Sequence, residues 1–297
     1  MVWDGIRACD NQFFVKFSDD ILAAWQAEVN ESEEQYAANS SLVASLLNQL
    51  GTMQLRPLLI GAWAASALYD VPAHHQASAV CIFFPFATQG KKADEWAHSH
   101  GMEVESPRHH VLQYLWNSLK VEHRHHMLML SSALTNMTLQ NIVEQERLEG
   151  GTTHVVIAGQ RIETPAPTLM MLSMLVSVFQ TMFTDTLRIW QLVDIGIMLR
   201  KQGHMVDFVK LQGWIERLHL VRMTRLVGTM LTTLFGFSYD ELPFISPTKN
   251  TDDADTMADF FLKGNSRTKS QLFRYCPGES ISSLFVSLSH SLERVEE

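Results

Sequence analysis

The residues best suited to chemistry lie on or beside two short apolar runs, residues 56–60 (RPLLI) and 80–84 (VCIFF). Both runs have the length and composition of buried strands. Gly61 follows the first run at once, and an alanine-rich segment follows Gly61, which predicts a strand, a tight turn and a helix. A helix N-terminus at such a turn can point a backbone amide at a phosphate. Gly61 is therefore a candidate phosphate contact, and the alternative is a simple strand-to-helix turn.

Magnesium at the second run would need two carboxylates spaced two residues apart, because alternate residues of a strand share one face. Magnesium prefers oxygen ligands, and a third acid on a neighbouring strand would complete the site. At the start of this run, Ala79 and Cys81 are two residues apart, but Ala79 offers no ligand and Cys81 offers sulfur. Glu122 is an acid on another expected strand. It is either a remnant metal ligand or base, or a solvated acid on an edge strand.

Histidines are concentrated in one part of the chain, with nine of the thirteen between residues 74 and 126. His123 and His125 are two residues apart and would share a strand face. If that strand lies beside residues 80–84, Cys81 could join them, and two imidazoles with a thiolate would suit zinc. The alternative interpretation is a scatter of surface and partly buried histidines.

Short segments along most of the chain share the pattern of one known family. They are Leu68-Tyr69, Val121-Glu122-His123, Val193-Asp194-Ile195, Leu234-Phe235-Gly236, Lys263-Gly264-Asn265 and Arg274-Tyr275-Cys276-Pro277. The chain thus resembles nucleotidyltransferases that are widespread in bacteria, often near surface-polysaccharide genes. The resemblance implies a polymerase-beta-like nucleotidyltransferase fold, magnesium as cofactor in an active member, and nucleotide-binding positions at Gly61, Ser66, His75 and Ser78.

The polar positions of that family pattern are altered here. Ile60 stands for a Lys, His75 for an Arg, Ala79 and Cys81 for two Asp, Ser177 and Thr181 for two His, and Trp190 for an Arg. The apolar framework matches while these seven positions do not. A loss confined to the site favours a scaffold that no longer performs the family's chemistry.

These residues need an α+β fold to position them. The pattern predicts a mixed, nucleotidyltransferase-like sheet flanked by helices and followed by a mainly helical C-terminal half. The expected regions are N-terminal helices over 1–50, the α/β core over 51–165 and the helical region over 166–297. Within them, paired strands are expected at 111–115 and 119–123, a hairpin at 153–163, helix breaks at Gly203 and Gly236, and a last helix over 258–292.

Composition bounds the class of protein. The chain has 297 residues, 46% of them hydrophobic, which is typical of a globular protein. A net charge of −9 gives no general attraction to nucleic acid or anionic lipid. Three widely spaced cysteines predict no disulfide framework and suit the cytoplasm. The first residues do not resemble a signal peptide, and the apolar run 169–183 is too short to span a membrane.

Three functions stay open at this point. The first is a catalytically degenerate nucleotidyltransferase, a pseudoenzyme that binds a nucleotide, a sugar phosphate or a protein partner. The second is an active enzyme that moves a nucleotidyl group from an NTP to an acceptor, with Glu122, Asp70 or Asp94 as substitute metal ligands. The third is a structural interaction protein whose methionine-rich helical half docks a partner.

Overall fold

The computed structural model describes residues 2–8, 17–75, 77, 79–108, 110–130, 132–184 and 188–245. The chain divides into two compact units. The first comprises residues 1–125 and 152–164, and the second comprises residues 126–151 and 165–297. Ser78 and the expected helix over 258–292 lie outside the described residues.

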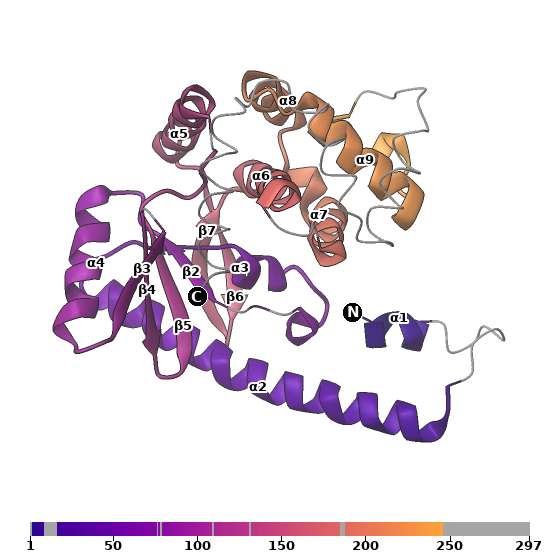
Figure 1. The fold of residues 1–297 in the computed structure, drawn as a ribbon, viewed down its shortest axis with the longest axis horizontal. Coiled ribbons are helices and arrows are strands. Elements are labelled where there is room, and N and C mark those ends of the chain that lie inside the picture. Colours follow the sequence, from indigo (N-terminus) through magenta and orange to yellow (C-terminus); the bar gives the residue numbers. More distant parts are fainter. Residues whose placement is uncertain are drawn as a thin grey trace, which may run out of the picture. The chain divides into compact units, whose positions relative to one another are not determined.

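A five-stranded mixed sheet forms the centre of the first unit (Figure 1), with strand order β1-β2-β5-β4-β3. The strands are β1 (Leu58–Ile60), β2 (Val80–Phe83), β3 (Val104–Arg108), β4 (Val111–Trp116) and β5 (Leu119–Arg124). β2 and β5 are parallel, and the other neighbours are antiparallel. The fold class predicted from the sequence is therefore confirmed, including the strand pair at 111–124.

The apolar strands β1 and β2 are covered on both faces. Every residue of β1 and β2 is buried. β4 and β5 instead alternate buried and more exposed residues, as antiparallel strands do when one face packs and the other meets solvent. This alternation leaves one face of β5 accessible for binding.

Helices of the first unit begin and end where the local sequence dictates. α2 (Asp19–Thr52) is one 34-residue helix with Asp19 and Asp20 in its first turn, where acids favour the helix dipole. Its apolar positions are buried only in the second half, from Ser40 to Leu50. α3 (Ala62–Ser66) is five residues long, shorter than expected, and α4 (Ala87–Ser99) lies between β2 and β3.

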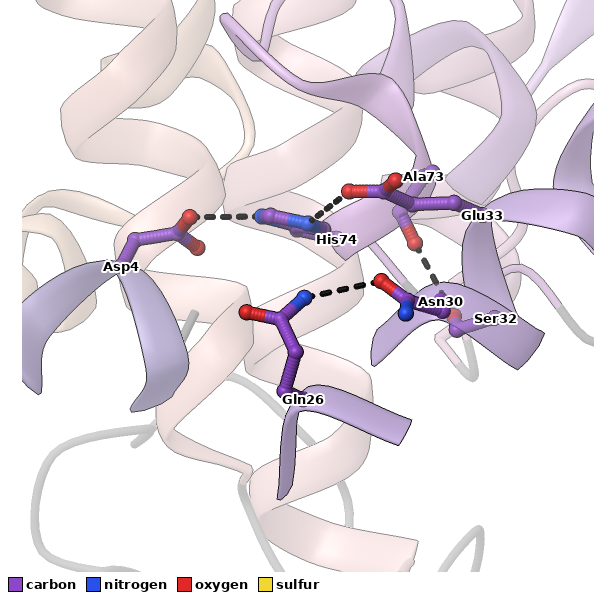
Figure 2. Close-up of polar contacts among 7 residues, drawn as sticks. All are labelled: Asp4, Gln26, Asn30, Ser32, Glu33, Ala73 and His74. Atoms are coloured by element: carbon purple, nitrogen blue, oxygen red, sulfur yellow. Dashed lines mark hydrogen bonds and ion pairs between the residues drawn. The ribbon is translucent and has the colours of Figure 1, made fainter. Parts of the chain in front are cut away.

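Two smaller elements complete the first unit. The hairpin of β6 (Thr152–Ile157) and β7 (Gln160–Pro165) forms where the sequence predicted it. The short 3-10 helix η1 (Pro72–His74) packs against α2 and precedes β2. His74 joins three elements (Figure 2): its Nδ1 lies 2.6 Å from Asp4 Oδ1 on α1 (Val2–Ala8), and its Nε2 lies 2.9 Å from Glu33 Oε1 on α2. This contact ties η1 to α1 and α2.

The second unit is helical. It contains α5 (Ala133–Leu148), α6 (Pro167–Thr184), α7 (Ile189–Gln202), η2 (Gly203–Met205), α8 (Phe208–Arg217), α9 (Val221–Phe235) and η3 (Tyr239–Glu241). α6 packs on α7 and α8, and α9 packs on the same two helices. Fully buried Met171, Leu172, Leu192 and Ile195 form the centre of this packing. None of the described helices is long and apolar enough to cross a membrane.

Candidate functional site

Side chains of β5 divide between two faces of the sheet. Leu119, Val121 and His123 are buried, whereas the alternate residues Lys120, Glu122 and Arg124 are not. A strand alternates its side chains, so these three polar residues share the more open face. The candidate site is built on this face, where β5 lies beside β2.

Cys81 is the β2 residue that faces this row. It is in register with Glu122 across the parallel strands and with Ile60 on β1. Its thiol donates to Glu122 Oε2 over 3.5 Å. A Cβ atom added to Gly61 would lie 3.7 Å from Cys81 Sγ, so the turn after β1 is directly beside the thiol. The structure thus brings together Gly61, Cys81 and Glu122.

Arg124 completes the cluster. Its Nε and Nη2 donate to the same oxygen, Glu122 Oε2, over 3.2 and 2.7 Å. The Glu122 side chain is 18% exposed and that of Arg124 is 35% exposed. Arg124 was not predicted as a site residue, because the expected strand ended at residue 123, whereas β5 extends to Arg124. Its spacing of two residues from Glu122 was the signal that could have found it.

Protonation states follow from these contacts. Burial, and then the neighbouring carboxylate of Glu122, raise the pKa of Cys81 to about 11, so the group is a neutral thiol at neutral pH. Burial alone would raise the pKa of Glu122, but the hydrogen bonds and charge of Arg124 outweigh it and lower that pKa. The cluster therefore holds one carboxylate, one guanidinium and one uncharged sulfur.

Magnesium does not fit this set of residues. Ala79 offers no ligand atom, the Cys81 thiol is protonated and soft, and Glu122 is already paired with Arg124. Asp94, considered as a substitute ligand, bonds His123 and His125 instead. Within the described ranges, no group of three or more His, Cys, Asp and Glu residues could hold a metal ion.

His123 points to the other face of the sheet and is 1% exposed. Its Nε2 lies 2.8 Å from Tyr114 Oη and its Nδ1 lies 3.1 Å from Asp94 Oδ1 on α4. The second oxygen of Asp94 is 2.9 Å from His125 Nε2. The expected zinc site of Cys81, His123 and His125 is therefore not assembled. Cys81 lies beside Glu122, and the alternation of side chains along β5 places the next residue, His123, on the opposite face.

The expected nucleotide-binding positions differ in accessibility. Gly61 is exposed and has φ 70°, ψ −146°, a conformation that favours glycine. Ser66 is fully buried, and its hydroxyl bonds Trp63 O and the Tyr36 hydroxyl. His75 is 2% exposed and its ring contacts Tyr69 edge-on. Gly61 is thus the described position of this set that a ligand could reach without rearrangement.

A cavity of about 680 Å³ lies away from this cluster. Its lining residues are Gly51, Gln54, Leu55, Arg56, Phe86 and Gln89. Leu55 and Arg56 precede β1, and Phe86 follows β2, whereas Gly61 and Ala79 lie beyond the other ends of these antiparallel strands. The cavity is consequently at the opposite end of the strand pair from the candidate site.

Comparison with family models decides the classification. Residues 1–236 match the model of a family described as an uncharacterised nucleotidyltransferase. The chain belongs to this nucleotidyltransferase family. In this nucleotidyltransferase-family protein, the match spans the strands, the turn at Gly61 and most of the helical region. A comparison with curated proteins finds no match.

Solved structures similar to this nucleotidyltransferase-family protein include two with related descriptions. One is the crystal structure of an antigenic nucleotidyltransferase-like protein from Paracoccidioides brasiliensis, with 15% identity, a TM-score of 0.41 and coverage of 61% of this chain and 87% of that one. The other is the solution structure of the antibiotic-resistance factor ANT(2'')-Ia, with 11% identity, a TM-score of 0.43 and coverage of 60% and 90%.

Proposed function

We propose that this nucleotidyltransferase-family protein binds a nucleotide or a sugar phosphate and does not transfer a nucleotidyl group by the magnesium-dependent route. One observation carries the proposal. The positions that would hold a metal present Ala79, directly before β2, and a neutral Cys81 thiol on β2, and the acid on β5 is neutralised by Arg124. The widely spaced cysteines support a cytoplasmic location for this activity.

Nucleotidyl transfer requires stabilisation of negative charge in the transition state. Phosphoryl transfer depends on positioning and on electrostatic stabilisation of the transferring group, and metal ions supply much of that stabilisation. A single carboxylate that is already ion-paired recruits a divalent cation poorly, because the cation must displace Arg124. Binding of a phosphate group has no such requirement, since guanidinium and backbone donors suffice.

Thermal unfolding with ATP, GTP, CTP and UTP, each with magnesium or with EDTA, tests the proposal. A ligand that binds the native state raises the Tm. We expect at least one nucleotide to raise the Tm equally in both buffers. A rise that requires magnesium, together with turnover of the nucleotide, would support the active enzyme instead. The absence of any rise would favour the interaction protein.

A further inference from the structure

Charge along the open face of β5 is positive apart from one paired acid. Lys120 and Arg124 flank Glu122, and all three share this face by strand alternation. Gln113 on β4 is in register with Glu122 and adds a neutral amide, and Glu105 on β3 is in register with Gln113 one strand farther out. The charges nearest to Cys81 are therefore the Glu122 carboxylate and the Arg124 guanidinium.

Arg124 is held in a defined position by this arrangement. Its two hydrogen bonds converge on one oxygen of Glu122, which restrains the guanidinium against the sheet. A guanidinium has five N–H donors, more than these two bonds use. The Arg124 side chain is also about twice as exposed as that of Glu122, at 35% against 18%. A pre-positioned, partly exposed arginine is suited to bidentate contact with a phosphate.

We infer that Arg124, positioned by Glu122, is the phosphate-binding cation of this site and makes binding independent of a divalent metal. The inference rests on the proposed function and names the residue through which it operates. The ligand class is a phosphate ester, either a nucleotide or a sugar phosphate. The neighbouring Cys81 supports this assignment, because its neutral thiol adds no negative charge that would repel the phosphate.

Removing the charge of Glu122 tests the inference through the direction in which phosphate affinity changes. A carboxylate beside the phosphate repels it, so Glu122→Gln removes the repulsion while the amide oxygen can still accept from Arg124. Phosphate binding through Arg124 therefore becomes tighter in this variant. A site in which Glu122 held a metal would respond in the opposite direction, because the variant would lose a metal ligand.

Isothermal titration in EDTA with ATP and with glucose 1-phosphate applies this test to the wild-type chain and to R124Q, R124K, E122Q and K92Q. We expect R124Q to weaken binding about 10- to 100-fold, the range for a lost charged hydrogen bond. R124K should fall between R124Q and the wild type, and E122Q should bind more tightly. K92Q removes an exposed lysine of α4 that is not part of the site, and as the control it should change affinity by about threefold or less. The two ligands distinguish a nucleotide site from a sugar-phosphate site.

The possible results distinguish failure of the Arg124 assignment from failure of the proposed function. If the wild-type chain binds either ligand in EDTA and R124Q binds it equally well, Arg124 is not the phosphate ligand, although metal-independent binding stands. If E122Q weakens binding, Glu122 acts on the ligand by another route and the inference fails. If the wild-type chain binds neither ligand, the proposed function fails with it. E122Q keeps a hydrogen-bond acceptor for Arg124, so its result stays decisive even if R124Q does not fold.

Discussion

Glu122 and His123 are adjacent on β5, but their surroundings favour the charged form of Glu122 and the neutral form of His123. Arg124 stabilises the charged form of Glu122, which lowers the pKa of that carboxyl despite partial burial. Burial stabilises the neutral form of His123 and lowers its pKa, and the opposing effect of Asp94 does not cancel the burial. One strand thus presents an ionised pair on one face and a neutral, fully bonded imidazole on the other.

Replacing His123 should change how stability depends on pH. Because the pKa of His123 is lower in the folded chain than the usual 6.5, the unfolded chain takes up a proton first as the pH falls below 6.5. Wild-type stability should therefore fall between pH 7 and 5.5, with a slope of at most about 1.4 kcal/mol per pH unit from this group. H123Q should be less stable at pH 7 but should lack this contribution to the slope.

Urea unfolding at pH 7.0 and 5.5 measures this difference, with H98Q on the exposed face of α4 as the matched control. Glu122 does not interfere, since a carboxyl with a lowered pKa loses its stabilising effect only below about pH 4.5. An unchanged slope in H123Q would contradict the neutral, buried assignment.

The turn between β1 and α3 is the element that places backbone next to Cys81. Gly61 has a positive φ, yet a Cβ at this position would meet nothing closer than 3.7 Å. A substitution there is opposed by backbone conformation and not by a steric clash. This distinguishes Gly61 from a glycine that is required by close packing.

The variant G61A should therefore be less stable than the wild type by about 1–3 kcal/mol. G51A is the matched control: Gly51 lies in the last turn of α2, an added Cβ there would meet nothing within 4 Å, and the residue has no positive φ. Its substitution should be stabilising by about 0.5–1 kcal/mol. Denaturant unfolding of both variants should give changes of opposite sign, and a neutral G61A would mean that the turn is not constrained as described.

Strands and helices were predictable where the apolar residues follow a clear strand or helix pattern. The strands at 58–60, 80–83 and 111–124 and the hairpin at 152–165 were confirmed. α2 was expected as two helices, because its polar middle lacks an apolar stripe. β3 was missed, since Pro107 argues against a strand except at a sheet edge, which is where β3 lies. α5 was missed as well.

The candidate site was predictable only in part. Glu122 and Cys81 could be placed on neighbouring strands, but their common face depends on the register between β2 and β5. The sequence alone does not define that register. A shift of one residue would place His123 instead of Glu122 beside Cys81. The expected zinc site failed for this reason, whereas Arg124 was overlooked because the expected strand ended one residue before it.

At the scale of the whole molecule, the chain passes between its two units more than once. Residues 126–151 belong with the helical unit, although they lie inside the expected core of 51–165, and the hairpin returns to the first unit. The family match extends across both units to residue 236. The net charge of −9 also means that a phosphate ligand needs a local cation, because the molecule as a whole repels anions.

Binding of Mn²⁺, a spectroscopically visible substitute for Mg²⁺, tests the central claim most directly. Electron paramagnetic resonance of Mn²⁺ titrated with the wild-type chain and with A79D/C81D would measure the affinity of the site without any nucleotide. We predict that the double variant, which restores oxygen ligands beside Glu122, binds one Mn²⁺ at least about tenfold more tightly than the wild type. Tight binding of one Mn²⁺ by the wild type, abolished in E122Q, would contradict the account.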